Sequence, residues 1–215
     1  LDDENMTAAD AAGFHDALIM GPVVDGPPLR NGAVKSLGFG IDAPSTAKVV
    51  AGTDARYSGL VAFGRSMTIA MWVHITAYTT YDQIIAYFTH ASSGSANYKL
   101  MHGSSFQVGG GTANLASKLS IGQTYFIVMR SSPDGLAFFV NGSLSASNPN
   151  SYSSTGTGGE GLMFPAAASW DYYGMRGYMS DVASFEHALS NTEILELWSM
   201  GAIPGRPMPR RAAKA

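Results

Sequence analysis

Short strand-forming runs, separated by turn residues, recur along almost the whole chain and constrain its fold most strongly. In the longest run, residues 66–75, Met, Ile and Val occupy every second position, while Trp72 and His74 fall on the other parity. This period of two is typical of a β-strand. Trp72 here and Trp198 near the C-terminus both belong to periodic apolar patterns and are predicted to be core residues. Further strands are predicted at residues 33–39, 49–50, 83–88, 97–101, 104–108, 113–116, 124–130, 136–140 and 177–185.

Turn chemistry separates these runs. Asn141-Gly142 predicts a two-residue type I′ hairpin between strands. The first thirty residues contain repeated Gly-Pro steps, and residues 143–161 are rich in Ser, Thr, Gly and Asn. Both segments are predicted to be loops.

One helix is predicted, near the C-terminus. Ser190 and Glu193 have the spacing of a capping box, and Ile194, Leu197 and Trp198 follow on one helical face. Gly201 is predicted to end this helix in the left-handed conformation. Because the pattern has many strands, one short helix and no alternation of strands with helices, we expect an all-β, two-sheet antiparallel β-sandwich.

Composition excludes several classes of protein. The 215-residue chain has only 13% charged residues and 46% hydrophobic ones, which argues against disorder. It has no cysteine, so disulfides and thiolate metal sites are excluded. No apolar run is long enough to span a membrane, and the acidic first residues show no signal-peptide pattern.

Charge is unevenly distributed. Four of the 13 basic residues lie in the last ten positions, so the preceding part is more acidic than the net charge of −3 indicates. We therefore expect no nucleic-acid partner and no membrane partner. The basic, Pro-rich residues 204–215 are predicted to be an extended tail, and alternatively a docking arm toward a protein assembly.

Several motifs resemble one family. Residues 67–73 (Met-Thr-Ile-Ala-Met-Trp-Val) are similar to its "F-T-I-x-x-W-V" strand, and residues 119–125 with 136–142 resemble "L-x-x-G-x-W-Y … L-x-L-Y-V-N-G". Residues 177–182 with 188–190 resemble "G-x-I-D-D-V … A-L-S". Their order resembles a laminin-G-like jelly roll of the concanavalin A-like lectin/glucanase superfamily over residues 1–203. The resemblance implies two curved antiparallel sheets.

The resemblance also implies one structural Ca²⁺ in many relatives. The positions matching that site are Asp181 and the carbonyl of Gly40, because calcium prefers carboxylate and carbonyl oxygens. This chain departs from the family at Ser180, where relatives carry an Asp. An alternative role for Asp181 is to cap turn amides or to pair with a cation.

Catalytic patterns are absent from the sequence. No acidic residue lies between Asp82 and Asp134, so the paired carboxylates of glucanase strands are missing. The five His show no metal-ligand spacing, and no Gly-x-Ser-x-Gly elbow is present. Residues 156–161 spell Gly-x-Gly-x-x-Gly but are predicted to be an inter-strand loop rather than a nucleotide site, because they open no helix.

Loops rich in aromatic and polar residues are the candidate binding sites. Sugar sites combine aromatic platforms with planar hydrogen-bonding groups. The same residues could instead form a protein interface or pack within the domain. The candidates are Trp170, Asp171, Tyr172, Tyr173 and Arg176 in one segment and Tyr81 and Asp82 in another.

The sequence therefore predicts a non-catalytic recognition module that binds a glycan or cell-surface polysaccharide. The alternative is a structural or decoration protein of a large assembly, such as a virion. Either role predicts an extracellular, virion-surface or cell-surface location. A glycoside hydrolase is disfavoured by the missing carboxylates.

Overall fold

The computed structural model describes most strands, their turns and the helix. The residues that it describes are 6–8, 17–20, 24–31, 33, 35–39, 48–51, 66–78, 83–90, 96–101, 105–108, 111–115, 117–149, 159–164, 176–185 and 187–202. Among them no helix is long and apolar enough to cross a membrane.

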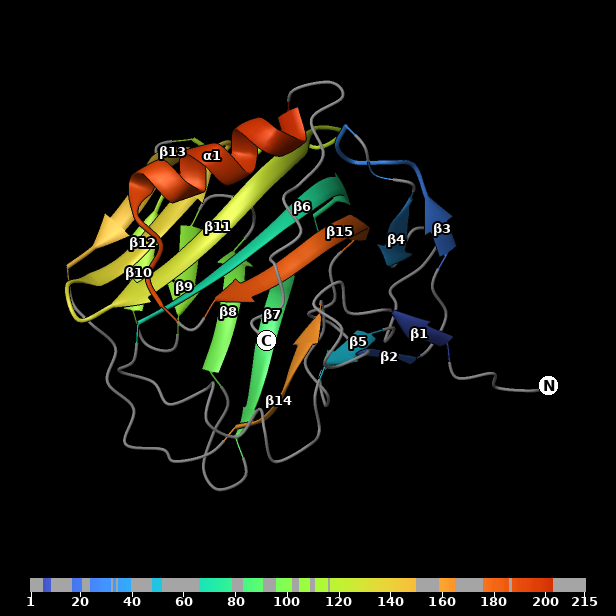
Figure 1. Cartoon of the computed structure of the whole chain (residues 1–215), viewed down its shortest axis with the longest axis horizontal. Helices are drawn as coiled ribbons and strands as arrows, with labels where there is room; N and C mark the ends of the chain where they lie inside the picture. Colours follow the sequence, from blue (N-terminus) through green and yellow to red (C-terminus); the bar gives the residue numbers. More distant parts are fainter. Residues whose placement is uncertain are drawn as a thin grey trace, which may run out of the picture.

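Two antiparallel sheets form the molecule (Figure 1). A seven-stranded sheet has the order β13-β12-β11-β6-β15-β4-β3, and an eight-stranded sheet has the order β1-β2-β5-β14-β7-β8-β9-β10. The edge strands β10 and β13 contact each other, so the two sheets meet along this side. The all-β sandwich predicted from the sequence is confirmed.

The strands of the seven-stranded sheet are β3 (Val24–Gly26), β4 (Ser36–Phe39), β6 (Met67–Ala77), β11 (Thr124–Ser132), β12 (Gly135–Val140), β13 (Ser143–Asn148) and β15 (Arg176–Phe185). The strands of the eight-stranded sheet are β1 (Met6–Ala8), β2 (Ala17–Met20), β5 (Lys48–Ala51), β7 (Gln83–His90), β8 (Ala96–Met101), β9 (Ser105–Val108), β10 (Gly111–Asn114) and β14 (Gly159–Phe164). The helix, α1, covers Asn191–Ala202.

The seven-stranded sheet buries side chains on both faces. On one face Ile69, Met71 and Ile75 of β6 are at most 1% exposed, and Ile127 and Met129 of β11 continue this layer. The other parity carries Trp72, Phe126, Val128 and Phe139, which pack with Ile194 beneath α1 (Figure 1). We call this helix-covered side the outer face. The predicted alternation of residues 66–75 is therefore confirmed.

Two loop predictions are wrong. Residues 143–161 contain β13 and the start of β14, and the first thirty residues contain β1, β2 and β3. Polar β13 is held in the sheet by its antiparallel pairing with β12, so tertiary pairing overrides a weak local preference. Within the predicted Gly-x-Gly-x-x-Gly loop, residues 159–161 likewise belong to β14, across a bulge.

The turn at Asn141-Gly142 is confirmed. Asn141 has φ 51° and Gly142 has φ 78°, as a type I′ turn requires, and Val140 pairs directly with Ser143. Gly201, by contrast, lies inside α1 and does not end it. A Cβ there would lie 2.5 Å from Cζ2 of Trp72, so glycine permits close approach of the helix to this indole.

Candidate functional site

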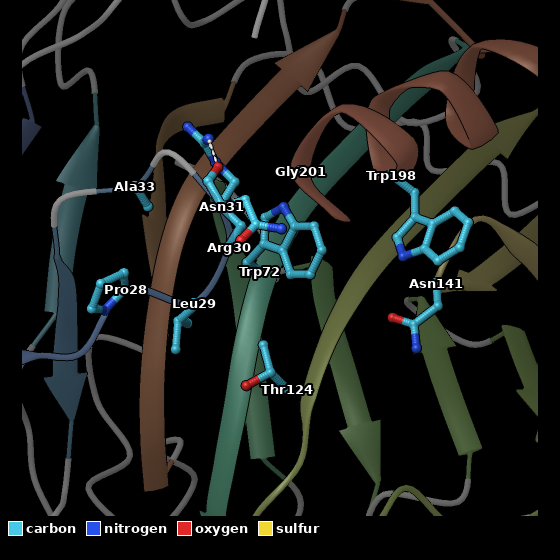
Figure 2. Close-up of a pocket in the computed structure, with 10 residues that line it drawn as sticks. All are labelled: Pro28, Leu29, Arg30, Asn31, Ala33, Trp72, Thr124, Asn141, Trp198 and Gly201. Carbon is cyan, nitrogen blue, oxygen red and sulfur yellow. Dashed lines mark hydrogen bonds between the residues drawn. The ribbon is translucent and has the colours of Figure 1, made fainter. Parts of the chain in front are cut away.

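The outer face carries a surface hollow of about 560 Å³ near the C-terminal end of α1 (Figure 2). This volume is within the usual range for small-ligand sites. The segment 28–33 forms one side, Trp198 and Asn141 the other, and Trp72 and Thr124 lie between them. The lining residues are Pro28, Leu29, Arg30, Asn31, Ala33, Trp72, Thr124, Asn141, Trp198 and Gly201.

Two indoles supply the apolar surface of this hollow. Trp72 points outward from β6, is 6% exposed and packs against Phe126 at a centroid distance of 5.3 Å. Trp198 is partly buried and belongs to the last turns of α1. The sequence predicted both indoles as core residues, and Trp72 is confirmed as one. Their joint contribution to a hollow was not predicted, because they lie 126 positions apart and come together only when α1 packs on the sheet.

Asn141 is fixed by the hairpin. Its backbone N–H donates to Phe126 O at 2.8 Å, and its Oδ1 accepts from Phe126 N–H at 2.9 Å. The amide is therefore held on β11 and lies below Trp198 on the same side of the hollow (Figure 2). The sequence marked Asn141 as a turn residue, and only the fold shows that its side chain also lines a site.

Thr124, which lines the hollow, forms a polar pair with His74. They are cross-strand neighbours, and Thr124 Oγ1 lies 2.9 Å from His74 Nδ1. Gly122 N–H, in the turn that precedes β11, donates to Ile75 O at 2.8 Å. This bond fixes the start of β11. His74 also contacts the ring of Tyr178, with centroids 6.0 Å apart.

The loop before β11 is held by tyrosines. Tyr78 donates its hydroxyl to Leu119 O at 2.6 Å, and Lys118 Nζ lies 4.0 Å from the centre of its ring. Burial, and secondarily the charge of Tyr125, raises the pKa of Tyr78 to about 12. The phenol therefore remains a neutral donor at physiological pH.

Arg30 is the charged residue among the described residues of the lining. Its Nη1 donates to Asn31 O at 2.9 Å and its Nη2 donates to Asp181 Oδ1 at 2.5 Å. The side chains of Arg30 and Asp181 are 12% and 21% exposed. This ion pair joins segment 28–33 to β15, and Asn31 N–H joins the same segment to Gly201 O of α1 at 3.1 Å.

This ion pair bears on the predicted Ca²⁺ ligand. Asp181 pairs with a cation, as the alternative interpretation of this residue expected, so a metal ion there would lie beside a guanidinium. The described residues thus do not favour calcium at Asp181, and they contain no group of three or more metal-binding side chains. Gly40 lies outside the described residues, and the calcium site stays a prediction.

Most of the predicted sugar-binding residues cannot be placed. Trp170, Asp171, Tyr172, Tyr173, Tyr81 and Asp82 lie outside the described residues. Arg176 begins β15 and pairs with Ala77, the last residue of β6. The two predicted segments thus adjoin strand ends that are paired with each other, while the tail, residues 204–215, is also outside the described part.

The described residues that line the hollow include no Asp, Glu or His, and therefore neither a carboxylate pair nor an activated nucleophile. Its indoles, amides and hydroxyl are binding groups.

Comparison with known proteins identifies the family of the chain. Residues 48–195 match the family model described as the concanavalin A-like lectin/glucanases superfamily. The chain belongs to this superfamily, as its motifs predicted. None of the curated protein sequences matches the chain significantly.

Solved structures share the fold at low identity. Domain 4 of AbnA, an extracellular arabinanase from Geobacillus stearothermophilus in complex with arabinotriose, is 14% identical with TM-score 0.64, and the match covers 84% of this chain and 87% of that one. A Trypanosoma rangeli sialidase is 14% identical with TM-score 0.65, covering 95% and 33%. The binding domain of botulinum neurotoxin DC, in complex with rat synaptotagmin II, is 14% identical with TM-score 0.63, covering 86% and 46%.

The present chain spans about a third of the sialidase chains that it resembles. At these identities the likeness shows the fold alone. Of these structures, one is a complex with arabinotriose and another is a complex with a protein, synaptotagmin II.

Proposed function

We propose that this protein is a non-catalytic module that recognises carbohydrate at an extracellular, virion or cell surface. The observation that carries the proposal is the hollow on the outer face, where two indoles are combined with the amide of Asn141 and the hydroxyl of Thr124. Sugar rings present apolar faces surrounded by hydroxyl groups, and a site of this composition complements both. The arabinotriose complex of a domain with the same fold supports the choice of ligand class.

Trp198→Ala tests this function. We expect wild-type protein to bind a set of glycans on an array, in the presence of calcium and of chelator. In titrations with the best glycan, Trp198→Ala should weaken binding by about 5- to 150-fold, because losing a stacking ring costs about 1–3 kcal/mol. Binding to no glycan would contradict the proposal.

Leu195→Ala is the matched control. Leu195 lies in the same helix, is 47% exposed and does not line the hollow. This variant should retain wild-type affinity, and melting curves of both variants should show cooperative unfolding. Trp170→Ala in the same titration tests the segment predicted from the sequence. A fall in affinity would show that this segment also contributes to binding.

A second candidate function is protein binding within a larger assembly. Leu144 of β13 and Leu195 of α1 are 50% and 47% exposed, and α1 contacts β13. Exposed apolar side chains and nearby aromatics are common in protein interfaces. Loss of a discrete oligomer on removal of residues 204–215, with a blank glycan array, would favour this function.

A further inference from the structure

The hydrogen-bonding groups of the hollow are unequally used. Three acceptors among its residues already have donors: Asn141 Oδ1 accepts from Phe126 N–H, Gly201 O from Asn31 N–H, and Asn31 O from Arg30 Nη1. The described residues of the lining also include no carboxylate. Among them, the acceptors left to a ligand are the second lone pairs of these oxygens and the hydroxyl of Thr124.

Donors are more plentiful than acceptors. Each indole carries an N–H, the Asn141 amide carries an NH₂ group, and a guanidinium has five N–H donors. The two bonds of Arg30 to Asn31 and Asp181 use one N–H of Nη1 and one of Nη2, and each of these nitrogens keeps a second N–H. The hollow is thus rich in donors and has a cation in its wall.

This imbalance discriminates between ligands. A neutral sugar hydroxyl must both donate and accept, so a donor-rich site leaves its hydrogen without a partner, which is costly when the group is desolvated. A carboxylate only accepts, and a guanidinium can bind it through two parallel bonds. We infer that the hollow binds an acidic sugar, with the ring against the indoles and the carboxylate toward Arg30. This inference rests on the proposed carbohydrate-binding function.

Asp181 sets the position of this guanidinium. It has φ 50°, which is unusual for a residue other than glycine, and lies beside a register shift in β15. Its charge partly neutralises Arg30. Asn tolerates the same left-handed conformation, so Asp181→Asn removes the charge with little backbone strain and should strengthen binding of an acidic ligand.

The experiment uses an array on which each hexuronate and nonulosonate glycan stands beside its carboxyl-reduced, neutral form. Wild-type protein should prefer the acidic member of the bound pairs at least about tenfold, since a charged hydrogen bond contributes about 1.5–3 kcal/mol. Raising the salt concentration should reduce this preference only in part, because the guanidinium is mostly buried. A simple carboxylate, acetate, should not compete, because it lacks the ring.

Variants distinguish the role of Arg30. Arg30→Gln should abolish the preference for the acidic form, Arg30→Lys should keep only part of it, and Asp181→Asn should increase it. Each variant is first checked by its melting curve, and the ratio of acidic to neutral binding is independent of the folded fraction. Equal binding of acidic and neutral forms by wild type would overturn the inference and leave the carbohydrate function standing. Binding of no glycan overturns both.

Discussion

Among the described residues, the two ends of α1 differ in what lies beside them, with a network of hydrogen bonds at the N-terminal end and the hollow at the C-terminal end. At the N-terminal end, Ser190 Oγ accepts from Glu193 N–H, while Ser190 N–H donates to the Glu193 carboxylate at 2.7 Å. Arg130 donates to Leu189 O and Asn191 Oδ1, and Thr68 bonds both His187 O and Leu189 N–H. This end is closed.

The C-terminal end of α1 stands over the hollow instead. There Gly201 brings the helix against Trp72, Asn31 ties a neighbouring segment to the last turn, and Trp198 is only partly buried. The hydrogen bonds of the closed end hold α1 on the sheet. The C-terminal end, which we call the open end, is therefore held in position beside the hollow. A helix that is held firmly at one end and borders a hollow at the other suits a binding site.

The largest effect should come from opening the closed end. Thr68 is fully buried, and its hydroxyl donates to His187 O at 3.0 Å and accepts from Leu189 N–H at 2.9 Å. Thr68→Val keeps the shape but leaves both backbone groups unpaired, at about 1–3 kcal/mol for each. We expect the free energy of unfolding, measured with urea, to fall by about 3 kcal/mol.

Thr124→Val is the control at the open end. Thr124 is partly exposed, and its hydroxyl is hydrogen-bonded to His74. When this bond is lost, water can take the place of the hydroxyl. The free energy of unfolding should change by less than about 1 kcal/mol. Equal losses in the two Thr→Val variants would mean that the two ends are equally closed, and the comparison would fail.

Gly201→Ala tests the contact between α1 and Trp72 at the open end. Helix propensity alone predicts a gain of about 1 kcal/mol, but the new Cβ would lie within 2.5–3.1 Å of three Trp72 ring atoms. Overpacking costs about 1–3 kcal/mol, so we expect net destabilisation of about 1 kcal/mol and altered tryptophan fluorescence. Ser199→Ala, in the same helical turn, should be nearly neutral. A stabilised Gly201→Ala protein would contradict this packing.

The sequence predicted the closed end well and the open end poorly. The capping box is local, because Ser190 and Glu193 are three residues apart and their chemistry requires no other element. Likewise, strict alternation in residues 67–75 predicts a strand whatever it packs against. These features were confirmed because their physical cause lies within a short stretch of sequence.

The hollow has no such local cause. Trp72, Asn141 and Trp198 each have a structural explanation in the sequence, as core, turn and core residues, and only strand pairing and helix docking bring them together. The glycine at position 201 was assigned to a helix stop, since the sequence could not reveal the indole against it. β13 was missed for a related reason, because its pairing with β12 outweighs its polar composition.

The smallest effect is a pH dependence at the closed end. Bonds from Ser190, first its backbone N–H and then its hydroxyl, lower the pKa of Glu193. Because the folded-state pKa is below the unfolded value of about 4.3, this stabilisation is present above that pH. It is lost as the pH falls through the folded pKa. Glu193→Gln should therefore reduce the loss of stability on acidification below about pH 4.5, measured as the melting temperature against pH. Glu196→Gln removes the same charge from α1 without touching the capping pair and should keep the wild-type slope. If both variants change the slope equally, net helix charge and not the capping pair controls this end.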